Sequence, residues 1–156
     1  MWIEKKDKEL YLESNQQGIR LITRKNVNEK IHKECVKFCR WLRKSYWFPI
    51  RCKIILFNTP YFKKENALDK DSVADFYYEE NDDLKIYPEI WVAVWKNPKR
   101  DEKEQIERVC GWIVHELTHY YQWYFLQFEK RTNRSLEIEA NKWSKYLTQE
   151  YFSITN

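Results

Sequence analysis

Apolar residues between positions 27 and 46 recur at steps of three and four, the spacing of one face of an amphipathic helix. They are Val27, Ile31, Cys35, Phe38 and Leu42. Asn26 and Glu29 have the spacing of a capping box, which makes Asn26 the predicted N-cap. The other face carries basic residues, namely Lys30, Lys33, Lys37, Arg40 and Lys44. We therefore expect a helix over residues 27–46 with one buried face and one basic face.

Several short stretches have the residue pattern of β-strands. Residues 52–57 form an apolar run rich in β-formers, typical of a buried strand, and residues 73–78 suggest a second strand. Residues 85–95 alternate, but Pro88 cannot donate to a β-ladder and therefore predicts an edge strand. Residues 18–23 alternate weakly and are compatible with one more strand. We expect a short, mostly antiparallel sheet.

Two further helices are predicted near the end of the chain. Asp101 and Glu104 have capping-box spacing, and only Gly111 interrupts an apolar helical pattern that continues to about residue 128. Because this helix is apolar nearly all round, we expect it to be central and buried. A last helix is predicted over residues 135–151. Its apolar stripe consists of Leu136, Ala140, Trp143 and Leu147.

Length and composition predict a single domain spanning residues 1–156. The chain is 43% hydrophobic and 17% aromatic, enough to bury a core and unlike a disordered protein. No apolar run approaches the roughly 20 residues that span a bilayer, and the first residues do not resemble a signal peptide. The four cysteines form no C-x-x-C pair, which favours free thiols in a reducing compartment. We therefore expect a cytoplasmic protein with no membrane contact.

The net charge of +4 is unevenly distributed along the chain. Residues 1–44 contain 12 Lys and Arg but only 6 Asp and Glu, so the excess of positive charge lies there. A basic region of this kind can contact nucleic acid weakly through the helix at 27–46. A solvated helix face without a partner is the other interpretation.

The motif that carries chemistry is His115-Glu116-Leu117-Thr118-His119, which has the form H-E-x-x-H. Residues i and i+4 lie on one face of a helix, so both imidazoles can bind one metal ion from the same side. Zn²⁺ accepts His nitrogens in a tetrahedral set. Glu116 points away from the ligand pair toward the open coordination position, where it can act as general base on a zinc-activated water.

A catalytic zinc usually has three protein ligands and one water, so one ligand remains to be found. The extended motif with a third histidine is absent, because Gln122 and Phe125 occupy the positions of its glycine and its histidine. The third ligand is therefore a carboxylate downstream. Glu137 and Glu139, near the start of the last helix, are the candidates.

The H-E-L-T-H motif followed by E-x-x-A-N at residues 137–141 resembles the gluzincin metallopeptidases. The resemblance covers about residues 50–150 and is greatest to small cytoplasmic peptidases of phages and mobile elements. It implies an α+β, zincin-like fold with an N-terminal packing helix, an active-site helix and a C-terminal ligand helix. It also implies that Glu137 is the third zinc ligand and that Asn141 orients a ligand histidine. Glu139 remains an alternative ligand, because its distance from His119 along the chain also occurs among gluzincins.

In zincin-type peptidases the strand beside the motif helix binds substrate as an added β-strand, through backbone amides and alternating side-chain pockets. The resemblance therefore implies substrate contacts at Trp91, Val92 and Ala93, although an ordinary core strand has the same pattern. A donor that stabilises the oxyanion should also exist. Sequence leaves open which tyrosine supplies it. The candidates are Tyr78, Tyr87, Tyr120, Tyr121, Tyr146 and Tyr151.

These patterns together predict a zinc metalloendopeptidase. Zn²⁺ is its expected cofactor, a protein or peptide its expected substrate, and Glu116 its general base. The alternative is a non-catalytic, zinc-stabilised module that binds a protein or nucleic acid through the basic helix 27–46.

Overall fold

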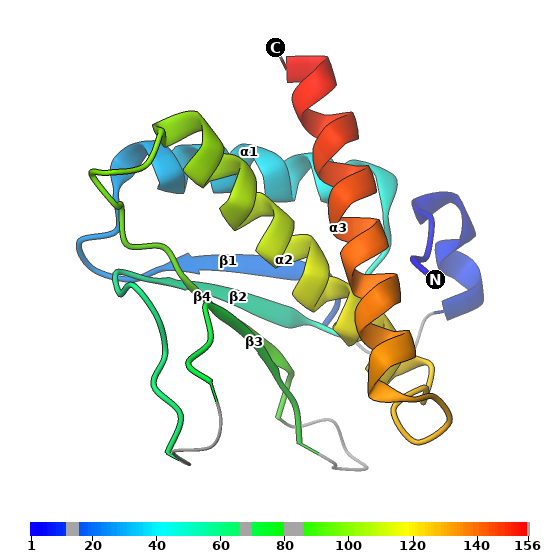
Figure 1. Cartoon of the computed structure of the whole chain (residues 1–156). Coiled ribbons are helices and arrows are strands. Elements are labelled where there is room, and N and C mark those ends of the chain that lie inside the picture. The colour runs from blue at the N-terminus through cyan, green and yellow to red at the C-terminus, as the bar shows by residue number, and fades with distance from the viewer. Residues whose placement is uncertain (12–15, 66–69, 80–85, 156) are drawn as a thin grey trace.

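Figure 1 shows the computed structural model of the chain, which describes residues 1–11, 16–65, 70–79 and 86–155. Within these residues the fold is α+β, with a four-stranded sheet and helices packed on it. The strands are β1 (Ile19–Thr23), β2 (Cys52–Phe57), β3 (Ala74–Tyr77) and β4 (Glu89–Ala93). The helices are the 3₁₀ helix η1 (Lys5–Tyr11), α1 (Glu29–Ser45), α2 (Glu102–Tyr124) and α3 (Asn133–Thr155). Helices α1 and α2 lie on one side of the sheet, and α3 packs against α2 (Figure 1).

The strand order is β1-β2-β4-β3. Strand β2 runs parallel to both β1 and β4, and only β3 pairs antiparallel, with β4. The prediction of a mostly antiparallel sheet is therefore wrong, and the sheet is mixed. The physical reason is α1, which carries the chain back over the sheet so that β2 starts at the same end as β1.

Strand β4 is not an edge strand, contrary to the prediction from Pro88. Both sides of β4 are paired, with β2 and with β3, and among the described residues the free edge on this side of the sheet belongs to β3. Pro88 lies just before the first residue of β4, where its main-chain oxygen accepts a hydrogen bond from Lys53 N–H at 3.3 Å. A proline that precedes a strand does not have to donate to the β-ladder, so Pro88 does not indicate an edge strand.

Helix α1 begins two residues later than the capping-box spacing predicted. Its N-cap is Asn28, whose side chain accepts hydrogen bonds from the main-chain N–H groups of Lys30 and Ile31, at 3.0 and 3.1 Å. Asn26 has a φ of 70° and belongs to the preceding turn. The predicted apolar face is otherwise confirmed. It buries Ile31, Cys35, Phe38, Cys39 and Leu42. All four cysteines are free and buried, as expected.

Helix α2 is the central helix, as predicted, and packs on β3, β4, α1 and α3. Asp101 caps it by accepting a hydrogen bond from Glu104 N–H at 3.0 Å. Gly111 brings α2 and α3 close together, because a Cβ there would lie 3.0 Å from Ser144 Oγ. That hydroxyl donates to the Gly111 carbonyl at 2.8 Å, so the two backbones are joined one turn before His115. Within the described residues, no helix has the length and apolar character needed to cross a membrane.

Candidate metal centre

His115 and His119 from α2 meet Glu137 from α3 at the side of the α2–α3 pair. Each oxygen of the Glu137 carboxylate faces one imidazole: Oε2 lies 3.0 Å from His115 Nε2, and Oε1 lies 2.9 Å from His119 Nε2. The two rings are 4.9 Å apart. The i, i+4 spacing of the histidines therefore places both Nε2 atoms on one side, as predicted, and α3 supplies the carboxylate.

These three side chains could hold a metal ion, because their ligand atoms all lie within 4.8 Å of one another. Tetrahedral ligands about 2.1 Å from Zn²⁺ are about 3.4 Å apart. The contacts between Glu137 and the two imidazoles are only slightly shorter than that, so a small outward shift of the carboxylate would admit an ion. Two imidazole nitrogens and one carboxylate are also a donor set that zinc accepts and that leaves a position open.

Asn141 hydrogen-bonds His115 through its side chain, one helical turn after Glu137 on α3. Burial and the neighbouring His119 lower the pKa of His115, while Glu137 and Asn141 act in the opposite direction. The net direction favours a neutral imidazole at neutral pH, which is the form that binds metal. Asn141 therefore has the contact that the resemblance implied, to a ligand histidine.

Glu139, the alternative ligand, faces away from the histidines into a different set of contacts. Its Oε1 accepts hydrogen bonds from Gln122 Nε2 and Arg131 Nη1, each at 2.8 Å. Burial alone would raise the pKa of Glu139, but these hydrogen bonds and the charge of Arg131 lower it to about 2. Glu139 is thus an ionised group that is already bonded elsewhere, and Glu137 is the carboxylate at the histidine pair.

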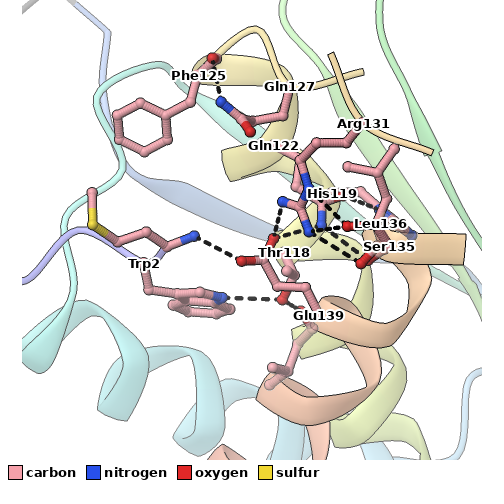
Figure 2. A network of polar contacts seen from close by, with 12 residues as sticks. Trp2, Thr118, His119, Gln122, Phe125, Gln127, Arg131, Ser135, Leu136 and Glu139 are labelled. Carbon is pink, nitrogen blue, oxygen red and sulfur yellow. Dashed lines mark hydrogen bonds and ion pairs between the residues drawn. The ribbon is translucent and has the colours of Figure 1, made fainter. Parts of the chain in front are cut away.

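Gln122 is a functional candidate that sequence reasoning treated only as the residue in place of a motif glycine. Its Oε1 lies 2.7 Å from His119 Nδ1, within hydrogen-bond distance, and its side chain is buried (Figure 2). The signal that was available is its position three residues after His119, because i and i+3 are neighbours on a helix. What Gln122 contacts on its other side depends on α3 and could not be read from the spacing.

Glu116 lies beside the histidine pair and is only 7% exposed. Burial, followed by the charges of Asp75 and Glu137, raises its pKa to about 8. The group therefore exchanges a proton near neutral pH when no cation is present. A cation held by the adjacent histidines would favour the carboxylate form, which can accept a proton.

A cleft of about 560 Å³ exposes this group of residues to solvent. Its lining includes His115, Glu116, His119 and Glu137 on the helix side. The opposite side is formed by β3 and the residue after it, with Ala74, Asp75, Phe76 and Tyr78. The cleft is therefore bounded by α2, by α3 and by the edge strand of the sheet.

Trp91, Val92 and Ala93 do not line this cleft, contrary to their predicted substrate contacts. They belong to β4, where β2 and β3 already use both sets of backbone groups, so a peptide cannot add to that strand. Val92 and Ala93 are buried in the sheet. The interpretation as an ordinary internal strand holds for these residues.

Among the six tyrosines considered as oxyanion donors, Tyr78 is the one that lines the cleft. The hydroxyl groups of Tyr120 and Tyr121 donate to the main-chain oxygens of Ile50 and Trp47, each at 2.6 Å. These two tyrosines fasten α2 to the segment before β2. Tyr78, just after β3, is therefore the one of these six tyrosines that could contact a group bound in the cleft.

Asp75 is a second cleft residue that sequence reasoning missed. Its Oδ2 accepts hydrogen bonds from Ser72 Oγ at 2.5 Å, Lys64 Nζ at 3.0 Å and the Tyr77 hydroxyl at 3.2 Å. These contacts fix a negative charge on the wall that faces Glu116. Lys64 and Ser72 lie in a loop, and no sequence pattern predicted that they would contact Asp75.

Comparisons with protein-family models, with curated proteins and with solved structures return no match to this chain. The features of the chain that bear on its function are the H-E-x-x-H helix, the convergent Glu137 and the cleft.

Proposed function

We propose that this protein is a zinc-dependent peptidase whose metal is held by His115, His119 and Glu137. The observation that carries the proposal is the convergence of a His-His pair on α2 with a carboxylate on α3 at an open cleft. The residue between the two histidines that faces the same cleft is a glutamate. Metal binding alone would not require a general base at that position.

The side chains divide the work of peptide hydrolysis among them. Zn²⁺ bound by the two histidines and the carboxylate would act as a Lewis acid toward the scissile carbonyl and would acidify a water molecule. Glu116 accepts the proton of the attacking water and returns it to the leaving amine. Asn141 holds the His115 ring in position through its hydrogen bond. Burial raises the pKa of Glu116 to about 8 when no cation is present, and a cation held by the histidines would favour the carboxylate form that accepts the proton.

The free edge of β3 is the surface on which an extended peptide would lie. Strand β3 pairs with β4 on one side, and three of its residues line the cleft opposite the histidines. A peptide added at this edge would use main-chain hydrogen bonds for affinity. This replaces β4 by β3 as the substrate strand and keeps the scissile bond beside Glu116.

Replacing Glu116 with Gln tests the proposed catalytic function. We expect Glu116→Gln to lower the rate of peptide hydrolysis by about 10²–10⁴-fold, because the general base is lost, while zinc remains bound. Cleavage of a mixed peptide library, followed by mass spectrometry, measures the rate without assuming a substrate. Glu107→Gln on the same helix is the matched control and should cleave like the wild type. Equal cleavage by wild type and Glu116→Gln would refute the proposal.

The basic face of α1 supports a second candidate function, a zinc-stabilised binding module. Lys33, Lys37, Arg40 and Lys44 are all exposed along one helix, at spacings of three and four residues. Such a stripe suits the phosphates of a nucleic acid. A binding module should be indifferent to Glu116→Gln, so the library experiment also separates the two functions.

A further inference from the structure

The amide of Gln122 has a single possible orientation in its surroundings. Its nitrogen Nε2 has two acceptors within reach, the Leu136 main-chain oxygen at 3.0 Å and Glu139 Oε1 at 2.8 Å. An amide nitrogen has two hydrogens to donate and an amide oxygen has none, so the atom facing these acceptors must be nitrogen. Oε1 consequently faces His119.

This orientation determines which ring nitrogen of His119 carries a hydrogen. Gln122 Oε1 can only accept, and His119 Nδ1 lies 2.7 Å from it. Two lone pairs at that distance would repel, so this contact requires a hydrogen on Nδ1. Glu137 Oε1 lies 2.9 Å from Nε2 and competes for the hydrogen of a neutral ring, but a metal ion on Nε2 would remove that competition and leave Nδ1–H.

We propose that Gln122 is a positioning residue that fixes His119 as the Nδ1–H tautomer and thereby presents Nε2 to the metal. Glu139 accepts a hydrogen bond from Gln122, and Arg131 donates to Glu139, so both residues restrict the orientation of the Gln122 amide (Figure 2). The tautomer of His119 does not depend on the proposed function. Only the expected effect of Gln122 on metal affinity rests on that function. Glu139, two residues after the ligand Glu137, would then serve the same site from its other side.

Arg131 fixes the outer end of this network. It donates to Glu139 Oε1 from Nη1 at 2.8 Å and to Ser135 Oγ from Nε at 3.1 Å. Arg131 Nη2 also donates to the Ser135 main-chain oxygen at 3.1 Å. Gln122 on α2 is therefore held by Glu139 on α3 and by a residue of the connecting segment, which gives its amide little freedom to turn.

A purely structural role for Gln122, joining α2 to α3, is the competing explanation. Gln105 allows the two to be separated, because it is also buried on α2 and also bonds to main-chain groups. Its Nε2 donates to the Trp95 oxygen at 2.6 Å and its Oε1 accepts from Asn97 N–H at 3.1 Å. No metal-site histidine is among these partners. Gln105→Met therefore makes the same change of shape as Gln122→Met and removes two buried hydrogen bonds, against three at Gln122.

The first test is the tautomer of His119 in Glu137→Ala, where no carboxylate competes for the Nε2 hydrogen, from long-range ¹H–¹⁵N spectra at pH 9. We expect Nδ1 to be the protonated nitrogen in this variant and when Gln105→Met is added to it. When Gln122→Met is added instead, the preference should be lost, so that the ¹⁵N shifts move toward a mixture of tautomers. Nε2–H in Glu137→Ala, or an unchanged Nδ1–H signal after the addition of Gln122→Met, would overturn the proposal.

A charge-swapped double variant keeps the test decisive if Gln122→Met does not fold. In Gln122→Glu/Glu139→Gln, made in the same Glu137→Ala background, the carboxylate at position 122 still accepts from His119 Nδ1, and the amide nitrogen at 139 donates to its other oxygen, while the bond to Arg131 is lost. We expect this variant to retain the Nδ1–H tautomer. Loss of that tautomer in a folded double variant would overturn the proposal.

The second test is zinc affinity, measured by competition with a chromogenic chelator. Loss of a residue that orients a ligand histidine typically weakens metal binding about 10–100-fold. We expect that loss for Gln122→Met, a smaller one for the charge-swapped variant and none for Gln105→Met. Equal loss in Gln122→Met and Gln105→Met would show a structural role only. Failure of the wild type to bind zinc would refute the proposed function, whereas the NMR spectra would still decide the tautomer.

Discussion

Aromatic neighbours hold the side chain of Tyr78 in place at the cleft. Its ring stacks against Phe76, with centroids 5.7 Å apart, and lies 5.4 Å from the Phe128 ring. The ring is thus fixed between the edge strand and the segment after α2. Tyr78 lines the cleft, where the proposed hydrolysis would form an oxyanion.

Tyr78→Phe should therefore lower the turnover number on the order of 10²-fold, because the ring remains and only the donor is removed. Zinc content and melting temperature should stay as in the wild type. Tyr146→Phe, an exposed tyrosine on α3 outside the cleft lining, is the control and should leave turnover unchanged. Steady-state kinetics on a peptide cleaved by the wild type gives the comparison, and equal turnover would remove Tyr78 from the mechanism.

At the residue scale, the sequence predicted which side chains come together when those residues are close along the chain. His115 and His119 lie on one helix, so their spacing alone places them together. Gln122 and Asp75 escaped prediction, because their partners come from α3 and from the loop before β3. Glu137 and Glu139 are close in sequence, and only the packing of α3 on α2 shows which one faces the histidines.

At the scale of elements, the contact between α2 and α3 positions the three residues that could hold a metal. Glu137 reaches the histidines only because the two helices approach closely at Gly111, where Ser144 Oγ fills the space of a side chain. A larger residue at position 111 must therefore push α3 outward. That movement would draw Glu137 away from the α2 histidines.

Gly111→Val should weaken zinc binding and destabilise the fold by about 1–3 kcal/mol, the usual cost of overpacking. Gly111→Ala/Ser144→Ala is the matched control, because removal of the hydroxyl makes room for the added methyl group. This double variant should bind zinc nearly as well as the wild type. Chelator competition and urea unfolding measure both quantities. Undiminished zinc affinity in Gly111→Val would show that the helix spacing does not set the ligand geometry.

The types of the elements could be predicted from sequence, but not their order in the sheet. Each strand and α-helix follows from a local pattern, and even the weak alternation before α1 forms β1, whereas the 3₁₀ helix η1 was not predicted. The place of β4 between β2 and β3 depends on pairing between distant segments, which Pro88 does not report. Asn28 rather than Asn26 caps α1, because the backbone turns at Asn26 with a positive φ.

At the scale of the whole molecule, the buried thiols make stability depend on pH. Burial raises the pKa of Cys39 to about 12, from an ordinary value of 9.0. Burial also raises the pKa values of Cys52 and Cys110. The folded protein keeps these protons above pH 9 while the unfolded chain releases them. The free energy of unfolding contributed by the thiols is therefore present below pH 9 and is lost between pH 9 and 12.

The free energy of unfolding should thus fall steadily when the pH is raised from 9 to 11. Urea unfolding at a series of pH values measures this slope. Cys39→Ala should be less stable at pH 8, because a cavity is created, but should show a shallower fall at high pH. Identical slopes for wild type and Cys39→Ala would mean that this thiol ionises as readily in the folded protein as in the unfolded chain.

The number of zinc ions per chain, by elemental analysis of protein purified without chelators, tests the metal centre most directly. We expect about one zinc per wild-type chain, because three protein ligands suffice to hold a catalytic ion. Glu137→Ala should lose the metal, whereas Glu150→Ala, which replaces an exposed glutamate on the same helix, should retain it. Absence of zinc from the folded wild type, or full retention by Glu137→Ala, would contradict the assignment of His115, His119 and Glu137 as a metal site.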